Sequence, residues 1–225
     1  MANIINMALV RQRQQKALKE KKPVNLDGPK FFTKSEIKVL RKHLREKAES
    51  ALFNKRKTAV REWLLIDLLT STGLRASEVC NLRIRDLGIG YGKSEIVVRS
   101  GKGNTCATIQ IPSSLKSHIK QFLKWKKRTG EPVDEDAFLV LGQRGKMTRQ
   151  GVNQIIKKNL KALGLYEPGK AVHALRHSYA VNVYQRSKDL RLVQKQLRHK
   201  NIQTTTVYAD VTSEEIQEQI KGLWS

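Results

Sequence analysis

Residues 57–82 read KTAVREWLLIDLLTSTGLRASEVCNL, and this stretch decides the fold. Its first part, residues 57–71, predicts a helix with apolar side chains around most of its circumference. These side chains are Val60, Trp63, Leu64, Ile66, Leu68 and Leu69. A helix that is apolar on most sides is buried, so we expect the other elements to pack around it. The pair Thr72-Gly73 ends this helix, and residues 76–82 predict a short helix after it.

The segment before this stretch has helical spacing, whereas the segment after it has the spacing of β-strands. Thr33 and Glu36 form a capping box, which predicts that a helix begins near residue 34. Two β-branched runs, 95–100 and 105–111, are separated by a Gly-containing turn and predict a β-hairpin. Further helices are expected at about 113–127, 149–163, 174–186, 189–197 and 214–223, and a strand is a candidate at 138–141. The sequence therefore predicts a mainly α fold with a small antiparallel β-sheet, of the α+β class.

The chain organisation follows from composition. Residues 1–30 are rich in Lys and Arg and end near an Asp-Gly-Pro turn, so we expect a basic N-terminal arm or linker. Residues 31–225 are expected to share one core as one domain, with a C-terminal helix at about 213–223. That helix is amphipathic, and it can pack on a neighbouring subunit or on its own core.

Charge is the strongest compositional signal. The 225 residues include 44 Lys plus Arg against 20 Asp plus Glu, a formal net charge of +24. An ordinary small-molecule enzyme needs no such excess, and a polyanionic partner explains it, with nucleic acid first and ribosomal or membrane-surface binding as alternatives.

Hydrophobic residues make up 39%, enough for a folded core. No stretch is apolar enough to span a membrane. Cys80 and Cys106 suggest neither a disulfide framework nor a zinc site, which favours a reducing, cytoplasmic location.

Several residues have the chemistry of a phosphodiester transferase. When an oxygen nucleophile attacks a phosphodiester, negative charge builds on the non-bridging oxygens, and guanidinium groups stabilise it bidentately. Arg75 and Arg176 are candidates for this role. His173 lies three residues before Arg176, so one helical turn presents an imidazole beside a guanidinium. Taken singly, each of these residues is better explained as a phosphate contact or a surface residue.

Three motifs taken together are more specific. They are TSTGLRASEVCNLRIRDL around Arg75, HALRHSYA at 173–180 and LRHKNIQTTTVYA at 197–209. They occur in this order, with the hairpin Lys102 between the first two. From about residue 31 to 212 the sequence resembles the tyrosine recombinase, or phage integrase, family. The resemblance implies the catalytic-domain fold of that family over residues 31–225.

The resemblance also implies a catalytic set, whose members are Arg75, Lys102, His173, Arg176, His199 and Tyr208, supported by Glu78. Tyr208, nine residues after His199, is the implied nucleophile, which forms a 3′-phosphotyrosyl link and needs no metal or other cofactor. Lys102 is the implied general acid, and His173 the general base or acid. The resemblance further implies that His199 donates a hydrogen bond to the scissile phosphate and that Glu78 orients a catalytic side chain, although Glu78 alone is equally well explained as a first-turn Glu favoured by the helix dipole. His177 also matches the family pattern, and we expect it to be structural because the next turn of the helix buries it.

Two departures from the family pattern stand out. The family often has Gly immediately before the third-motif histidine, where this chain has Arg198. This puts a tight turn there in doubt and suggests that Arg198 contacts a backbone phosphate. Only 30 residues precede the catalytic body, so the usual N-terminal DNA-clamping domain is missing. Three explanations stay open. The basic arm is a reduced substitute for that domain, the sequence is trimmed, or the protein is a short form like the fimbrial-switch invertases.

The sequence therefore predicts a site-specific DNA recombinase that acts on double-stranded DNA as a homodimer or tetramer and associates with the nucleoid. Integration, excision, inversion and dimer resolution share this chemistry and stay open. One alternative is an enzyme that relaxes DNA like a type IB topoisomerase. The other is a DNA-binding accessory or architectural protein that keeps the fold without productive catalysis.

Overall fold

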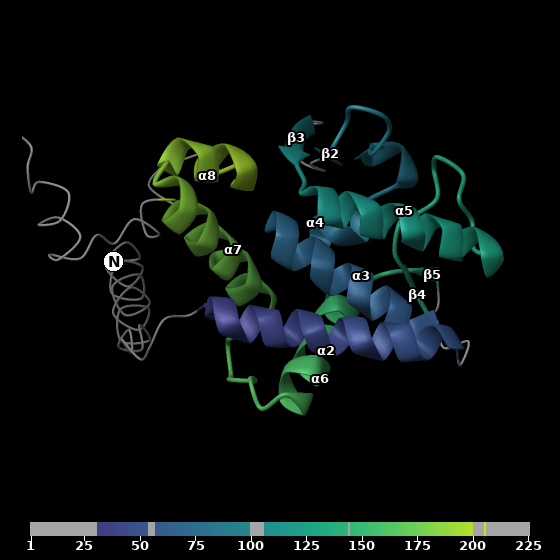
Figure 1. The fold of residues 1–225 in the computed structure, drawn as a ribbon, viewed down its shortest axis with the longest axis horizontal. Coiled ribbons are helices and arrows are strands. Elements are labelled where there is room, and N and C mark those ends of the chain that lie inside the picture. The colour runs from purple at the N-terminus through teal and green to yellow at the C-terminus, as the bar shows by residue number, and fades with distance from the viewer. Residues whose placement is uncertain (1–30, 54–56, 100–105, 144, 200–204, 206–225) are drawn as a thin grey trace, which may run out of the picture.

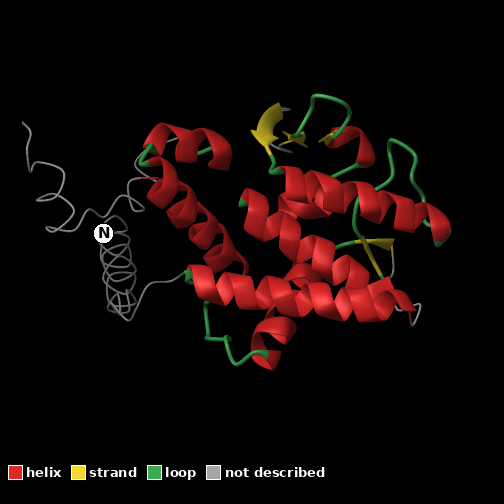
Figure 2. Cartoon of the chain, viewed as in Figure 1, coloured by secondary structure: helices red, strands yellow, loops and turns green. Residues whose placement is uncertain are grey.

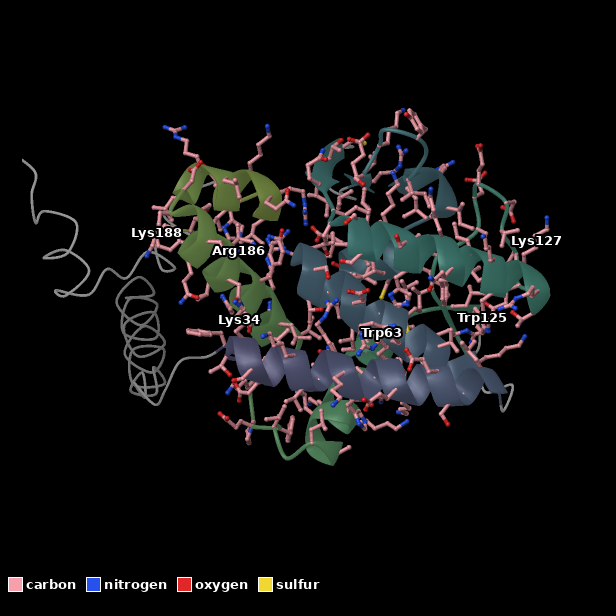
Figure 3. All side chains as sticks on the ribbon, in the orientation of Figure 1. Lys34, Trp63, Trp125, Lys127, Arg186 and Lys188 are labelled. Carbon is pink, nitrogen blue, oxygen red and sulfur yellow. The ribbon has the colours of Figure 1, made fainter. Side chains whose placement is uncertain are left out.

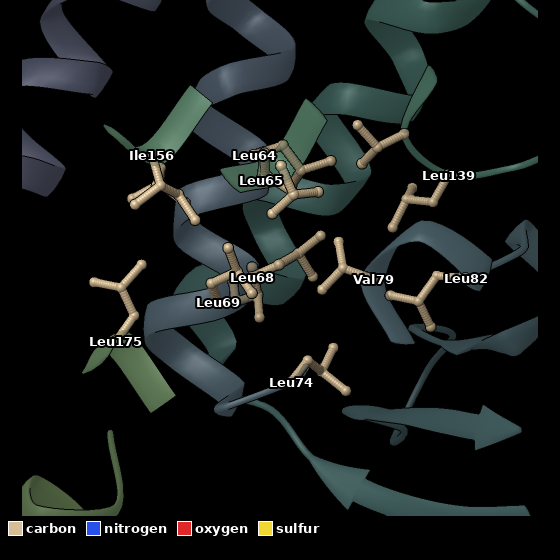
Figure 4. Close-up of a cluster of buried hydrophobic side chains, with 14 of the residues drawn as sticks. Leu64, Leu65, Leu68, Leu69, Leu74, Val79, Leu82, Leu139, Ile156 and Leu175 are labelled. Carbon is tan, nitrogen blue, oxygen red and sulfur yellow. The ribbon is translucent and has the colours of Figure 1, made fainter. Parts of the chain in front are cut away.

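Helix α3 (Lys57–Thr72) lies at the centre of the fold. The computed structural model describes residues 31–53, 57–99, 106–143, 145–199 and 205. Figure 4 shows Leu64, Leu65, Leu68 and Leu69 of α3 in the middle of the hydrophobic cluster. Each of these four side chains is at most 1% exposed. The prediction that this helix is buried is confirmed.

The remaining helices surround α3. They are α2 (Lys34–Phe53), α4 (Ala76–Asn81), α5 (Ser113–Arg128), α6 (Arg149–Ala162), α7 (Val172–Ser187) and α8 (Leu190–Leu197), with a short 3-10 turn at Ile84–Asp86 (Figures 1 and 2). Helix α2 begins at its predicted start, the other α-helices lie within two residues of their predicted bounds, and the mainly α class with small antiparallel sheets is confirmed. The helix predicted at 214–223 and the N-terminal arm lie outside the described residues.

The predicted hairpin forms one side of a three-stranded antiparallel sheet. The strands are β1 (Leu87–Gly88), β2 (Glu95–Arg99) and β3 (Cys106–Gln110), in the order β1-β2-β3. Ile96 of β2 pairs with Leu87 on one side and Ile109 on the other. Ile96 and Ile109 are fully buried, so one face of the sheet covers the core. The short strand β1 was not predicted, and the hairpin tip at 100–105 lies outside the described residues.

The strand predicted at 138–141 is wrong except for its last residue. Only Leu141 is in a strand, β4 (Leu141–Gly142), which pairs with β5 (Gly145–Lys146). Before it, Leu139 and Val140 are buried, and Phe138 forms only an isolated antiparallel bridge with Arg83, where the Leu139 N–H donates to the Leu82 carbonyl oxygen (2.9 Å). The Lys126 ammonium donates to the carbonyl oxygens of Phe138 (3.0 Å) and Leu139 (3.3 Å). An apolar run predicts burial, and here it did not distinguish a strand from a coil.

Helix α2 begins as its capping box predicts. The Thr33 backbone N–H donates to Glu36 Oε2 (2.6 Å), and the Glu36 N–H donates to Thr33 Oγ1 (3.2 Å). Next to this cap, Phe32 is buried and its N–H donates to Ser178 Oγ of α7 (2.7 Å). This contact of Phe32 joins the start of the described chain to the helix that carries the second motif. None of the described helices is long and apolar enough to cross a membrane.

Candidate active site

Gly73 shapes the turn that places Arg75. Its φ of +62° lies in the left-handed region. A Cβ atom at this position would lie 2.6 Å from Tyr179 Cδ1 and 2.9 Å from Leu197 Cδ2, so only glycine lets α7 and α8 pack so closely on the end of α3. Arg75 follows as the N-cap residue of α4, with an extended backbone and a side chain that is 44% exposed. The turn thus presents a guanidinium at the surface beside α7 and α8.

Arg176 comes to the same turn from α7. The residue is only 6% exposed, and its guanidinium Nη1 donates to the Gly73 carbonyl oxygen. Its Nη2 donates to the Leu197 carbonyl oxygen at 2.7 Å. The side chain therefore joins the end of α3, helix α7 and the end of α8. These contacts bring the two predicted arginines to one place although they are far apart in sequence.

His199 follows the end of α8 and is held on both sides. Its backbone N–H donates to the Gln194 carbonyl (3.1 Å), and its ring Nδ1 lies 2.9 Å from Thr205 Oγ1. Burial, together with the nearby Arg176, Arg75 and Arg198 charges, lowers the imidazole pKa to about 4. The ring is therefore neutral at pH 7. When Thr205 donates to Nδ1, the single ring proton lies on Nε2, where it can be donated to an anion.

The two histidines of the second motif differ in exposure. His173 is exposed on the first turn of α7, one turn before Arg176, as its spacing predicts. His177 is half-buried one turn further on. Burial lowers the pKa of His177, and the His173 and Arg176 charges add to this effect. An exposed imidazole beside a buried guanidinium is accessible to a substrate, whereas the structural role predicted for His177 stays a prediction.

Glu78 connects the first and third motifs. Its carboxylate accepts from the Arg75 backbone N–H (Oε2, 2.7 Å) and from Arg75 Nη1 (Oε1, 3.0 Å). Arg198 Nη2 also donates to Oε2, at 2.6 Å. Burial raises the pKa of the Glu78 carboxyl, but Arg198 and Arg75 together lower it below its usual value. The carboxylate is therefore charged at neutral pH and shared by two arginines.

The tight turn before His199 is present although Arg198 replaces glycine. Arg198 itself adopts the left-handed conformation, with φ 56° and ψ 41°, as the C-cap of α8. Its side chain is bound to Glu78 in this structure, whereas the sequence suggested a phosphate contact. Sequence reasoning missed this ion pair and the contact of Thr205 with His199. The only available signal for the first was a charged residue at a position where glycine is common.

The structure thus brings together four of the predicted residues, which are Arg75, Glu78, Arg176 and His199. His173 shares a helix with Arg176. Lys102 and Tyr208 lie outside the described residues, so their places stay predictions. Two guanidinium groups and a neutral imidazole around one turn form a site for an oxyanion. Within the described ranges, no group of three or more His, Cys, Asp or Glu side chains is arranged to hold a metal ion.

A second basic region, the α2/α5 groove, lies apart from this site. It is a cavity between α2, α3 and α5, and its lining includes Lys38, Arg41, Arg45, Trp63, Lys124 and Lys127. Figure 3 shows Trp63 near α2, with Lys127 at the far end of α5. Trp63 stacks on His118, and the buried Asp67 binds both His118 (2.6 Å) and Arg41 (2.7 Å). None of the four assembled site residues lines this groove.

Comparisons with known proteins agree with this geometry. Tyrosine recombinase XerA of Pyrococcus furiosus is 34% identical over 194 residues, which are 86% of this chain and 61% of that protein. Tyrosine recombinase XerD of Bradyrhizobium diazoefficiens is 29% identical over 203 residues, 87% of this chain and 63% of the relative. The chain therefore spans less than two thirds of the length of these curated relatives.

Solved structures show the same fold. A crystal structure of XerA recombinase matches with a TM-score of 0.67 at 26% identity, over 93% of this chain and 72% of the other. The XerH site-specific recombinase bound to its difH substrate, in a pre-cleavage complex, matches with a TM-score of 0.72 at 26% identity, over 90% of this chain and 57% of the other. Residues 30–215 match the sequence profile of the Phage integrase family. Since this match covers most of the sequence, the chain belongs to the phage integrase family.

Proposed function

We propose that this chain is the catalytic part of a site-specific DNA recombinase, which cleaves and rejoins DNA strands through a 3′-phosphotyrosyl intermediate. The observation that supports this most directly is the meeting of Arg75, Arg176 and His199 at one turn, with Glu78 behind Arg75. Two fixed guanidinium groups suit a phosphodiester whose non-bridging oxygens gain charge in the transition state. The relatives named tyrosine recombinases point to the same chemistry.

In the proposed reaction, the Tyr208 oxygen attacks the scissile phosphorus and the bond from phosphorus to the 5′ oxygen breaks. The phenol proton passes to His173, and Lys102 donates a proton to the departing 5′ oxygen. Arg75 and Arg176 stabilise the charged non-bridging oxygens, to which neutral His199 donates a hydrogen bond. Rejoining reverses these steps, with a 5′ hydroxyl of a partner strand as the attacking group. The phosphotyrosyl ester keeps the bond energy, so no external energy source is required.

The proposed partner is double-stranded DNA, bound by a homodimer or tetramer. The net charge of +24 favours a polyanion, and the matched XerH structure holds a DNA substrate. A location at the nucleoid follows from that partner. A protein that acts on DNA in this way exchanges strands between two duplexes, so two sites must be held together during the reaction.

Covalent capture tests the nucleophile. We expect the wild-type protein to form a denaturant-resistant adduct with some members of a library of nicked, sequence-randomised duplexes, because a nick lets the 5′ end diffuse away and traps the intermediate. Tyr208→Phe should abolish the adduct and leave DNA affinity nearly unchanged, since only the attacking oxygen is removed. Gel electrophoresis in denaturant measures the adduct, and sequencing of the captured DNA identifies the target site.

Tyr91→Phe is the matched control, because Tyr91 is fully exposed and lies outside the assembled site. An adduct that persists in Tyr208→Phe would show that another residue is the nucleophile. Two labelled duplexes carrying the captured sequence then separate the functions. Recombinant products support strand exchange, relaxed plasmid alone supports a topoisomerase-like activity, and DNA binding without either product supports an accessory role.

A further inference from the structure

Arg198 occupies a backbone position that disfavours its side chain. Among the residues that the structure describes, only Lys188 and Arg198 combine a side chain with a positive φ. The left-handed conformation brings a Cβ atom too close to the following carbonyl oxygen, which is why glycine is usual at such helix ends. A guanidinium kept at this position therefore has to be explained by its contacts.

Those contacts are specific and shielded from water. The Arg198 side chain is 11% exposed and its partner Glu78 is 14% exposed. Arg198 Nη2 donates to Glu78 Oε2 at 2.6 Å, and Nη1 donates to the Gln196 carbonyl at 3.1 Å. The first contact joins residues 120 positions apart in the sequence. It fixes the turn that carries His199 against α4, the helix that begins at Arg75.

The charge balance of the three side chains shows what Arg198 contributes. Glu78 alone would neutralise Arg75, because its carboxylate accepts from both the Arg75 guanidinium and the Arg75 backbone. Arg198 binds the same carboxylate, so the three groups together keep one net positive charge. Arg75 is the more exposed of the two arginines, at 44% against 11% for Arg198.

We propose that Arg198 is a positioning residue, which holds the Glu78 carboxylate so that Arg75 is oriented and keeps its positive charge for the scissile phosphate. This rests on the proposed function as far as the phosphate is concerned. Arg198 places Arg75 by holding Glu78, and this part of the proposal does not depend on DNA. The two parts can therefore be tested separately.

The test uses Arg198→Gly and Arg198→Lys in the full chain. Glycine accepts the left-handed conformation, so the first variant should stay folded while it loses the guanidinium. At saturating DNA, we expect Arg198→Gly to form the covalent adduct up to about 100 times more slowly, the cost of misplacing a reacting group by about 1 Å. Arg198→Lys should recover part of the rate because it restores the charge. DNA affinity should change little in both variants.

Lys195→Ala is the control for a simple phosphate contact, because Lys195 is an exposed cation on the same helix. If it contacts DNA, its loss weakens affinity but leaves the cleavage rate at saturating DNA unchanged. An Arg198→Gly variant that behaves in the same way, with weaker binding and an unchanged rate, overturns the proposal.

A second readout does not need activity. The Nε–H resonance of Arg75, followed by NMR relaxation in the free protein, should be ordered in wild type and in Arg198→Lys and mobile in Arg198→Gly. Equal order in wild type and Arg198→Gly overturns the proposal whatever the cleavage rates. If wild type forms no adduct with any duplex, the proposed function fails, and this measurement still decides the role of Arg198.

Discussion

At the scale of single residues, the site combines one buried group that keeps its charge with another that loses it. Arg176 stays charged while buried because backbone carbonyls accept from its guanidinium. His199, among the same cations, loses its charge instead. Spacing alone predicted that His173 and Arg176 share one helical turn. It could not predict the ion pair of Arg198 with Glu78, which depends on how α8 packs against α4.

The neutral state of His199 predicts a pH dependence of stability. Its pKa of about 4 in the folded protein lies below the ordinary 6.5. Between these values the unfolded chain binds a proton that the folded chain does not, so the His199 contribution to the free energy of unfolding is complete above pH 6.5 and is lost as pH falls toward 4. Urea unfolding of wild type and His199→Gln at pH 7 and pH 4.5 measures this.

The variant should lose less stability than wild type over this interval, because it lacks the titrating ring. The carboxyl groups of Glu78 and Asp67, whose pKa values lie below their ordinary values, contribute equally to both proteins. Identical losses in the two proteins would mean that His199 titrates normally. An NMR titration of the ring should give a midpoint well below 6.5 and provides an independent check.

At the scale of elements, helices were predictable because their apolar spacing and caps are local. The buried helix α3 and the capping box at Thr33 both follow from neighbouring residues. The segment at 138–141 was not predictable as a single bridge, because its partners are Arg83 and Lys126, which belong to other parts of the chain. The short strand β1 forms only because β2 lies beside it. Local sequence thus determines the helices, whereas contacts between elements determine strand β1 and the segment at 138–141.

The junction of α3 with α7 and α8 gives a prediction at this scale. Gly73→Ala should lower the free energy of unfolding by about 3 kcal/mol, from left-handed strain together with the overlap of its Cβ with the Tyr179 ring. Gly130→Ala is the matched control, because Gly130 also has a positive φ but has open space around it. It should lose only about 1 kcal/mol. Equal losses in urea unfolding would show that the packing of α7 on this turn is not tight.

At the scale of the whole molecule, we expect the net charge of +24 to serve two uses. Arg75 and Arg176 lie at one turn, where their loss should affect rate more than affinity. Many other cations are distributed over the surface, including those that line the α2/α5 groove (Figure 3). The total charge was evident from composition, and its division into two uses stays a prediction.

The salt dependence of DNA binding tests the role of the cations outside the site. For duplex binding measured by fluorescence anisotropy, log K plotted against log salt should have a slope of about −5 or steeper, as for about six neutralised phosphates, because each one releases condensed cations. Arg75→Ala should make the slope shallower by about one unit. A nearly flat line for wild type would contradict an electrostatic mode of binding.

The place of Arg176 also affects how this protein should be studied. Its guanidinium donates to the carbonyl groups of Gly73 and Leu197, so truncation would leave two buried acceptors unpaired and loosen three segments. An Arg176 variant would therefore confuse loss of chemistry with loss of folding. A reagent intended to trap bound DNA uncut is better made at Tyr208, where a single oxygen is removed. Arg176 is then best used as a probe of how this turn is assembled.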